Sequence, residues 1–182
     1  MRIAATLSIL LLVVAAGVCS RPIDADEPPK DGQTKPPELE ELDRLVGSWD
    51  TDVTFKPSVW QPEGRRVKGS VTTQWTLGGW FVREQGRSVA EDVEHTFMAT
   101  YDVTKMAYRS WYFDSTGASS EWRGRWNGDT KTIAWEADLG DGIKAVSKHH
   151  FTDADHHEVD VLAKDRDGKV FMDMQAKHSR RK

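Results

Sequence analysis

The sequence contains few of the residues on which several common classes of protein depend. Its 182 residues include one cysteine, Cys19, so a disulfide framework within the chain is excluded. Acidic residues outnumber basic ones, 29 to 25, and the chain lacks the excess of lysine and arginine that nucleic-acid binding requires. Sequence motifs for a serine nucleophile elbow, a phosphate-binding loop or a zinc-protease helix are also missing. We therefore expect no catalytic activity.

The first twenty residues have the features of an export signal. Arg2 supplies a positive charge, an apolar run follows to Val18, and small residues precede Ser20. The run is too short for a comfortable membrane span. We therefore expect residues 1–20 to be a signal peptide and the protein to be periplasmic or secreted. Cys19 offers an alternative, a lipoprotein anchored to the membrane through this residue, although Val18 replaces the small residue expected before a lipidated cysteine.

The next segment differs in composition from everything after it. Residues 21–38 hold five of the seven prolines and almost no apolar side chains, which is typical of a linker. The acidic excess of the chain lies in this segment and the few residues after it, from Arg21 to Asp43. The part of the chain from Arg44 to Lys182 is therefore close to neutral. We expect one folded domain over residues 39–182.

A short amphipathic helix followed by strands is predicted for this domain. Apolar residues recur at helical spacing behind Pro37, at Leu39, Leu42, Leu45 and Val46. From residue 49 the apolar period changes to two, which indicates half-buried strands. About ten strands are predicted, near residues 49–55, 67–77, 80–90, 94–103, 106–114, 118–126, 130–139, 142–151, 156–164 and 169–177.

Turn residues between these strands indicate antiparallel hairpins. Gly78–Gly79, Asn127–Gly128 and Asp167–Gly168 tolerate the positive φ of tight turns. No segment has the length of a helical crossover, so the sheet should be antiparallel throughout. An all-β, up-and-down barrel leaves no exposed sheet edge and is the predicted fold, with a two-sheet sandwich as the alternative.

Several motifs resemble those of one known superfamily. The segment 45–49 leads a helix into Gly-x-Trp at the first strand, which is similar to the opening of lipocalin-like (calycin) barrels. The segments 75–82, 101–103, 108–111 and 114–117 resemble, more closely, a bacterial family of secreted lipocalin-like domains of unknown function. The resemblance spans residues 39–182. It implies a barrel with an interior large enough for a ligand, and it transfers no catalytic residue.

The same resemblance implies how one end of the barrel is closed. In the superfamily the tryptophan of Gly-x-Trp packs across the closed end against an arginine of the last strand. The corresponding tryptophan here is Trp49, and the candidate arginines are Arg180 and Arg181. These residues are therefore expected to have a structural role.

Apolar residues predicted to face the interior suggest a binding pocket. Ligand sites are mostly apolar, with a few polar groups for orientation. The long connection over residues 56–66 should frame the open end. A filled core would give the same pattern, although the resemblance favours a hollow barrel. The predicted lining is Phe55, Trp60, Trp80, Phe97, Met172 and Met174.

Two histidines are predicted on the inner face of neighbouring strands. Alternation with Ala145 and Ser147 takes His149 inward, and the alternation of the next strand takes His157 inward. Neutral imidazoles with nearby carboxylates suit zinc or nickel, so a divalent metal site is one hypothesis. A polar hairpin end with solvated histidines is the other.

His95 and Glu84 are two further polar candidates for the interior. His95 shares a strand face with Phe97 and Tyr101, and if that face is inward the histidine is a candidate axial ligand for haem. A core histidine with satisfied hydrogen bonds is the alternative. Glu84 alternates with the apolar Val82, so we expect it inside, paired with an arginine of a neighbouring strand.

These observations lead to one main hypothesis and two alternatives. The main hypothesis is an exported lipocalin-like barrel that binds a small apolar or amphipathic molecule, without catalysis or a cofactor. The alternatives are a barrel that binds a metal or haem, and a filled barrel that acts as a protein-interaction module. Membrane association is expected only if Cys19 carries a lipid.

Overall fold

A computed structural model describes residues 34–88 and 93–182 of the chain. The predicted signal peptide, residues 1–20, lies outside the described residues, as does the predicted linker up to residue 33. Within the described part of the chain, no helix has both the length and the apolar character needed to cross a bilayer.

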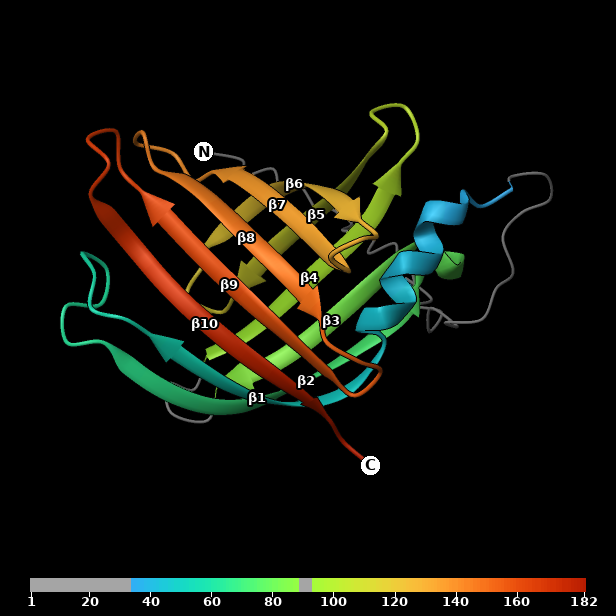
Figure 1. The fold of residues 1–182 in the computed structure, drawn as a ribbon, viewed down its shortest axis with the longest axis horizontal. Coiled ribbons are helices and arrows are strands. Elements are labelled where there is room, and N and C mark those ends of the chain that lie inside the picture. Colours follow the sequence, from blue (N-terminus) through green and yellow to red (C-terminus); the bar gives the residue numbers. More distant parts are fainter. Residues whose placement is uncertain (1–33, 89–92) are drawn as a thin grey trace, which may run out of the picture.

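Ten antiparallel strands form a closed barrel in which each strand pairs with its neighbours in the chain (Figure 1). The first strand pairs with the last and completes the closure. The predicted up-and-down barrel is therefore confirmed, and the sandwich alternative is wrong. The strands are β1 (Gly47–Phe55), β2 (Arg65–Thr76), β3 (Phe81–Ser88), β4 (Val93–Asp102), β5 (Ala107–Asp114), β6 (Ser119–Asn127), β7 (Thr132–Asp138), β8 (Lys144–Phe151), β9 (His156–Lys164) and β10 (Val170–Arg180).

The last strand is longer than the sequence pattern predicts. Strand β10 continues to Arg180 instead of ending near residue 177, because it has a partner strand on each side. His178 lies opposite His157 of β9, and Arg180 lies opposite Trp49 of β1. Two polar side chains beyond the expected end of the strand therefore join the barrel.

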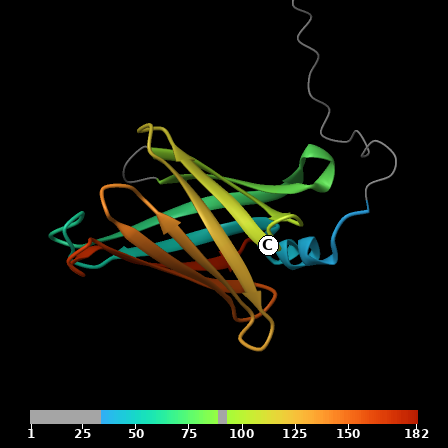
Figure 2. The ribbon, with the colours of Figure 1, turned by 90° about the horizontal axis from the view of Figure 1, so that it is seen from above.

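The 3₁₀ helix η1 (Pro37–Leu45) covers one end of the barrel, as two perpendicular views show (Figures 1 and 2). A second, shorter 3₁₀ helix, η2 (Leu77–Gly79), connects β2 to β3. Its leucines, Leu39, Leu42 and Leu45, recur every third residue and are all buried. A 3₁₀ helix has three residues per turn, so this spacing places the three side chains on one face. The predicted helix is confirmed, but Val46 follows it as the C-cap.

Helix η1 closes this end by packing its leucines on the inner side chains of the barrel. The Tyr108 hydroxyl donates a hydrogen bond of 2.7 Å to the Glu38 carbonyl and ties the helix to β5. We call this end the closed end and the space enclosed by the strands the lumen. The buried residues of the closed-end cluster are Leu39, Leu42, Leu45, Val82, Ala99, Tyr108, Ile133, Trp135 and Phe151.

A second apolar cluster lies toward the opposite end, which we call the open end because the β1–β2 connection lies there. Trp122 of β6 packs against residues of β9 and β10, which are not its neighbours in the sheet, so this contact crosses the lumen. The open-half cluster consists of Val159, Val161 and Ala176, with Val53, Trp122, Met172 and Met174 packed against them.

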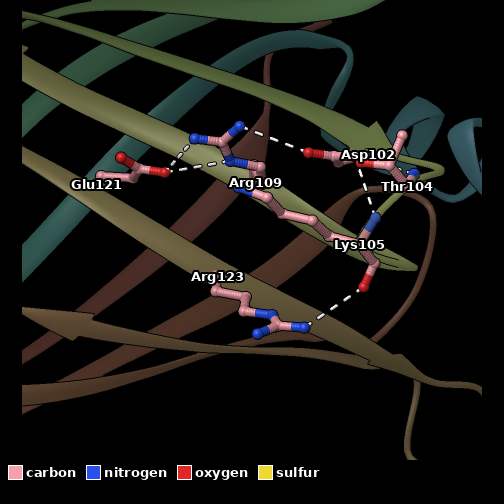
Figure 3. A network of polar contacts seen from close by, with 6 residues as sticks. All are labelled: Asp102, Thr104, Lys105, Arg109, Glu121 and Arg123. Atoms are coloured by element: carbon pink, nitrogen blue, oxygen red, sulfur yellow. Dashed lines mark hydrogen bonds and ion pairs between the residues drawn. The ribbon is translucent and has the colours of Figure 1, made fainter.

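The outer face of β4, β5 and β6 carries charged side chains that pair with one another (Figure 3). Arg109 donates a hydrogen bond of 3.1 Å to Glu121 and also lies 3.5 Å from Asp102. Arg123 reaches the Lys105 carbonyl in the loop after β4. Glu121 and Arg123 alternate along β6 with the partly buried Trp122, so these charged side chains lie on the solvated exterior of the barrel.

Leu42→Ala should destabilise the domain by about 2 to 5 kcal/mol, because it leaves a cavity beneath the helix at the closed end. Leu42 is fully buried, whereas Glu40 of the same helix is exposed. Urea unfolding followed by circular dichroism measures the effect. Glu40→Ala is the matched control, and an equal loss in both variants would contradict the role given to Leu42.

Candidate binding site inside the barrel

The closed end is held by a contact between the first and last strands. Trp49 is 1% exposed, and its Nε1 donates a hydrogen bond of 2.9 Å to the Leu45 carbonyl. The Arg180 guanidinium lies 4.1 Å from the centroid of the Trp49 ring, a cation–π contact. Arg180 also donates to the carbonyls of Val46 and Ala154, both at 2.9 Å.

The second candidate arginine has a different position. Arg181 forms an exposed ion pair of 2.8 Å with Asp50, on the outward face of β1. Of the two arginines considered from the sequence, Arg180 is thus the one that meets Trp49, and Arg181 does not.

Three histidines from adjacent strands face the lumen next to the closed end. His157 and His178 are 2% and 8% exposed, and their rings stack with centroids 4.1 Å apart. The ring of His149 lies 6.3 Å from that of His157 and 6.2 Å from Trp135. These four side chains, Trp135, His149, His157 and His178, form a continuous series of rings on β7 to β10, which we call the histidine arc.

Burial keeps the histidines of the arc in their neutral form. Desolvation and the neighbouring His178 lower the pKa of His149 to about 4. Desolvation, reinforced by the repulsion of His178 and His149, lowers the pKa of His157 to about 2. Burial also lowers the pKa of His178. At neutral pH the arc is therefore polar and uncharged.

A carboxylate lies in the same lumen. Glu84 of β3 is 3.4 Å from Nε2 of His95 and accepts a hydrogen bond of 3.2 Å from the Thr73 hydroxyl. The partner expected from the sequence was an arginine, and this prediction is wrong. Arg83 and Arg87 alternate with Glu84 and take the outer face, whereas His95 of β4 reaches Glu84 diagonally across the strand pair.

A glycine makes this diagonal approach feasible. Gly86 lies directly opposite His95 in the register of β3 and β4. A Cβ at this position would lie 2.3 Å from Cε1 of His95, so only glycine leaves room for the ring there. The geometry places His95 and Phe97 on the inward face, as one of the two sequence interpretations requires.

The hydrogen bonds of Glu84 offset the cost of its burial. Desolvation alone would raise the pKa of this carboxyl group, but the hydrogen bond with His95 and the nearby imidazoles of His178 and His149 outweigh it. The net effect is a pKa below the ordinary value. Glu84 therefore stays ionised in the lumen at neutral pH.

The predicted lining residues occupy three different levels of the barrel. Trp80 and Phe97 pack against the closed-end cluster, and Met172 and Met174 pack against the open-half cluster. Phe55 and Trp60 contact each other at 5.2 Å. Trp60 is 47% exposed and belongs to the β1–β2 connection, so it lies at the rim of the open end.

The lumen is accessible to solvent at several of its polar and apolar side chains. The side chains of Glu84 and His95 are 18% and 22% exposed although both point inward. Trp122, Met172 and Met174 are likewise only partly buried. An open hollow of about 620 Å³ is lined by residues from both faces of β2 to β5, among them the inward Gly86 and His95 and the exposed Arg87 and Glu94.

The metal and haem hypotheses find limited geometric support. Within residues 34–88 and 93–182, no group of three histidine, cysteine or carboxylate side chains is arranged to hold a metal ion. His149 and His157 do share the inner face, but their rings are stacked. Nε2 of His95 is directed at Glu84, which makes this nitrogen a hydrogen-bond partner.

His178 and Gly86 were not identified from the sequence. His178 continues the alternation of Met172, Met174 and Ala176, so extending the last strand by a few residues would have placed it inside. A glycine in the middle of a strand is a known sign of a close approach between side chain and backbone, and this signal was present at Gly86.

Comparison with known proteins identifies the family. The sequence profile of a family described as "Protein of unknown function (DUF1579)" matches residues 35–180. The chain belongs to the DUF1579 family. No curated protein matches the chain at a significant level.

Solved structures resemble this DUF1579 domain in fold. An S-type phycobiliprotein lyase, CPES from Guillardia theta, superposes with a TM-score of 0.55 at 15% identity, covering 80% of this chain and 93% of that one. Rv2717c from M. tuberculosis superposes with a TM-score of 0.58 at 16% identity, covering 82% of this chain and all of the other. At these identities the likeness establishes a shared lipocalin-like barrel.

Arg180→Met should destabilise the domain by about 2 kcal/mol, because the variant loses the cation–π contact and leaves two carbonyls without their donor. Arg181→Met removes only an exposed ion pair and should cost less than about 1 kcal/mol. Chemical denaturation of both variants measures the difference. Equal losses would show that Arg180 does not hold the closed end.

The buried histidines should make the protein less stable in acid. Their pKa values in the folded state lie below the ordinary value, so the unfolded chain binds more protons as the pH falls below about 6.5. From there to about pH 4, His149 and His157 should each remove up to about 1.4 kcal/mol of stability per pH unit. Replacing His149 and His157 together by Gln should reduce this slope, measured by urea unfolding between neutral and acidic pH.

The neighbouring exposed histidines provide a matched control for this experiment. His150 and His156 are adjacent in the chain to His149 and His157 but lie on the outer face. Replacing this outer pair by Gln should leave the slope nearly unchanged. A slope that responds equally to the inner and outer pairs would contradict the role of burial.

Proposed function

We propose that this DUF1579 domain is an exported lipocalin-like barrel that holds a small apolar or amphipathic molecule in its lumen. The proposal rests mainly on the inner wall of the open half. There, Trp122 of β6 and the two methionines of β10, Met172 and Met174, pack against the same buried cluster from different strands and remain partly accessible to solvent. Apolar side chains that are enclosed by strands and still reachable from solvent are what a ligand pocket requires.

The shape of the two ends supports one direction of access. The closed end is covered by helix η1 and by the buried Trp49, whereas the open end carries strand-to-strand connections, among them the long β1–β2 connection, and no described helix. At that rim Phe55 lies between the Trp60 ring at 5.2 Å and the Arg65 guanidinium at 5.7 Å. A molecule entering from the open end would first meet these side chains and then the methionines of β10.

The export part of the proposal rests on the sequence alone. Residues 2–20 combine a basic start, an apolar run and small residues, as a signal peptide does. A lipid anchor at Cys19 would keep the same barrel at a membrane surface. Both forms leave the lumen available to a ligand.

Met174→Lys should lower the affinity for the neutral apolar dye Nile red at least about tenfold, because it places an ammonium group on the apolar inner wall. The measurement is the rise in dye fluorescence on titration with the untagged protein. The melting temperature and the circular dichroism spectrum of each variant are recorded in parallel, so that loss of folding is recognised.

Gln175→Lys is the matched control for this variant. Gln175 is the next residue of β10 and is exposed on the outer face, so the same charge is added on the other side of the same strand. Dye affinity should stay as in the unmodified protein. If the wild-type protein binds no dye, or if both variants bind equally well, the lumen is not the binding site.

A further inference from the structure

Several hydrogen-bonding atoms on the inner wall of the barrel have no partner. Among the described residues, these include Nε1 of Trp135, Oγ of Ser110 and Nδ1 of His149, His157 and His178. Ser110, Trp135 and His157 are at most 2% exposed. A buried polar group left without a hydrogen bond costs about 1 to 3 kcal/mol, and native proteins tolerate few of them. Five such atoms in one lumen therefore require a common explanation.

These atoms lie in one region of the lumen. Trp135, His149, His157 and His178 form the histidine arc, a series of rings on four consecutive strands. Ser110 of β5 is opposite Trp122 of β6, whose ring crosses the lumen toward β9 and β10. The unpartnered atoms thus lie beside the closed-end cluster, of which Trp135 is a member, on the side where Trp122 packs against both clusters.

The chemistry of these groups indicates what is missing. The indole N–H of Trp135 can only donate, whereas a serine hydroxyl and a neutral imidazole can each donate one hydrogen bond and can also accept one. The one carboxylate nearby, Glu84, already accepts from Thr73 and lies beside His95. Trp135 therefore requires an acceptor, and the same acceptor can be bound by the Ser110 hydroxyl and by each imidazole in the tautomer that carries its proton on Nδ1.

We propose that the molecule bound in the lumen is an amphipathic acid whose carboxylate accepts hydrogen bonds from the histidine arc. This inference rests on the proposed function and specifies the ligand class for the same site. The carboxylate would lie at the level of Trp135 and His149, and the apolar part would extend past Trp122 and Met174 toward the open end. The order of the layers, with the polar arc deeper than the apolar open half, determines this orientation.

The charge of the ligand can be balanced inside the barrel. The charged and titratable groups around the arc are Glu84 on β3, His95 on β4, and Arg180 on β10. Glu84 is paired with His95, and Arg180 lies over Trp49, whose ring contacts His157 edge-on at 4.6 Å. Protonation of one imidazole of the arc on binding would neutralise the incoming carboxylate.

Calorimetric titration with three probes of equal chain length tests this inference: dodecanoic acid, dodecanol and dodecylamine. The untagged protein is used after extraction of any co-purified molecule. The acid should bind at least about tenfold more tightly than the alcohol and the amine, because it alone supplies two acceptor oxygens with a negative charge.

Variants that remove a donor and keep an aromatic ring locate the carboxylate. His149→Phe and, independently, Trp135→Phe should each weaken binding of the acid about tenfold and leave binding of the alcohol unchanged. His150→Phe is the matched control, since His150 follows His149 in the chain and is exposed on the outer face. It should change neither affinity.

Each other result overturns the inference in a recognisable way. Equal affinity for the acid and the alcohol would mean that the arc does not select a carboxylate. Tightest binding of the amine would show that Glu84 selects a cation instead. If the protein binds Nile red but none of the three probes, the ligand class is wrong while the proposed function stands. If the protein binds neither Nile red nor any of the three probes, the proposed function and the proposed ligand class are both wrong.

Discussion

Pairing of the first strand with the last is the constraint on which the rest of the structure depends. Strands β1 and β10 share a register that runs from Trp49 opposite Arg180 to Phe55 opposite Met174. This pairing satisfies the edge hydrogen bonds of both strands and encloses a lumen. Since side chains alternate along every strand, the closure also determines which half of them lies inside. The cation–π contact of Arg180 with Trp49 and the inward position of His178 both follow from this register.

Inside the closed barrel, the side chains form layers of different polarity. Leucines of η1 fill the closed end, an imidazole-rich layer with Glu84 follows, and methionines and Trp122 line the open half. A polar layer between two apolar ones is unfavourable for stability, because buried imidazoles and carboxylates lose their hydration. Hydrogen bonds with Thr73 and His95 replace part of the hydration that Glu84 loses. The Nδ1 atoms of the histidine arc have no such partner. Groups that break the rules of a stable core in this way commonly mark a functional site.

Strand positions, antiparallel order and barrel closure follow from the period of two and the turn residues, because both are local properties of the sequence. The inward direction of His149 and His157 follows from the same alternation. The partner of Glu84 does not, since alternation gives the face of a residue but not which neighbour reaches it diagonally past Gly86. Trp60 lies in the connection between β1 and β2, where no alternation of side chains predicts its direction. The inner position of His178 depends on where β10 ends, and that end is set by pairing with β1 and β9.

The location of the histidine arc on the last four strands has a consequence for how the protein is made. Its members lie between residues 135 and 178, and the strand that carries His178 must also pair with residues near the start of the domain. Contacts so distant in the chain form slowly, since loop closure is entropically unfavourable. His178 can join the arc only after the final strand has paired with β1 and β9. The lumen is therefore among the last parts of the molecule to mature, and a ligand can stabilise only the completed barrel.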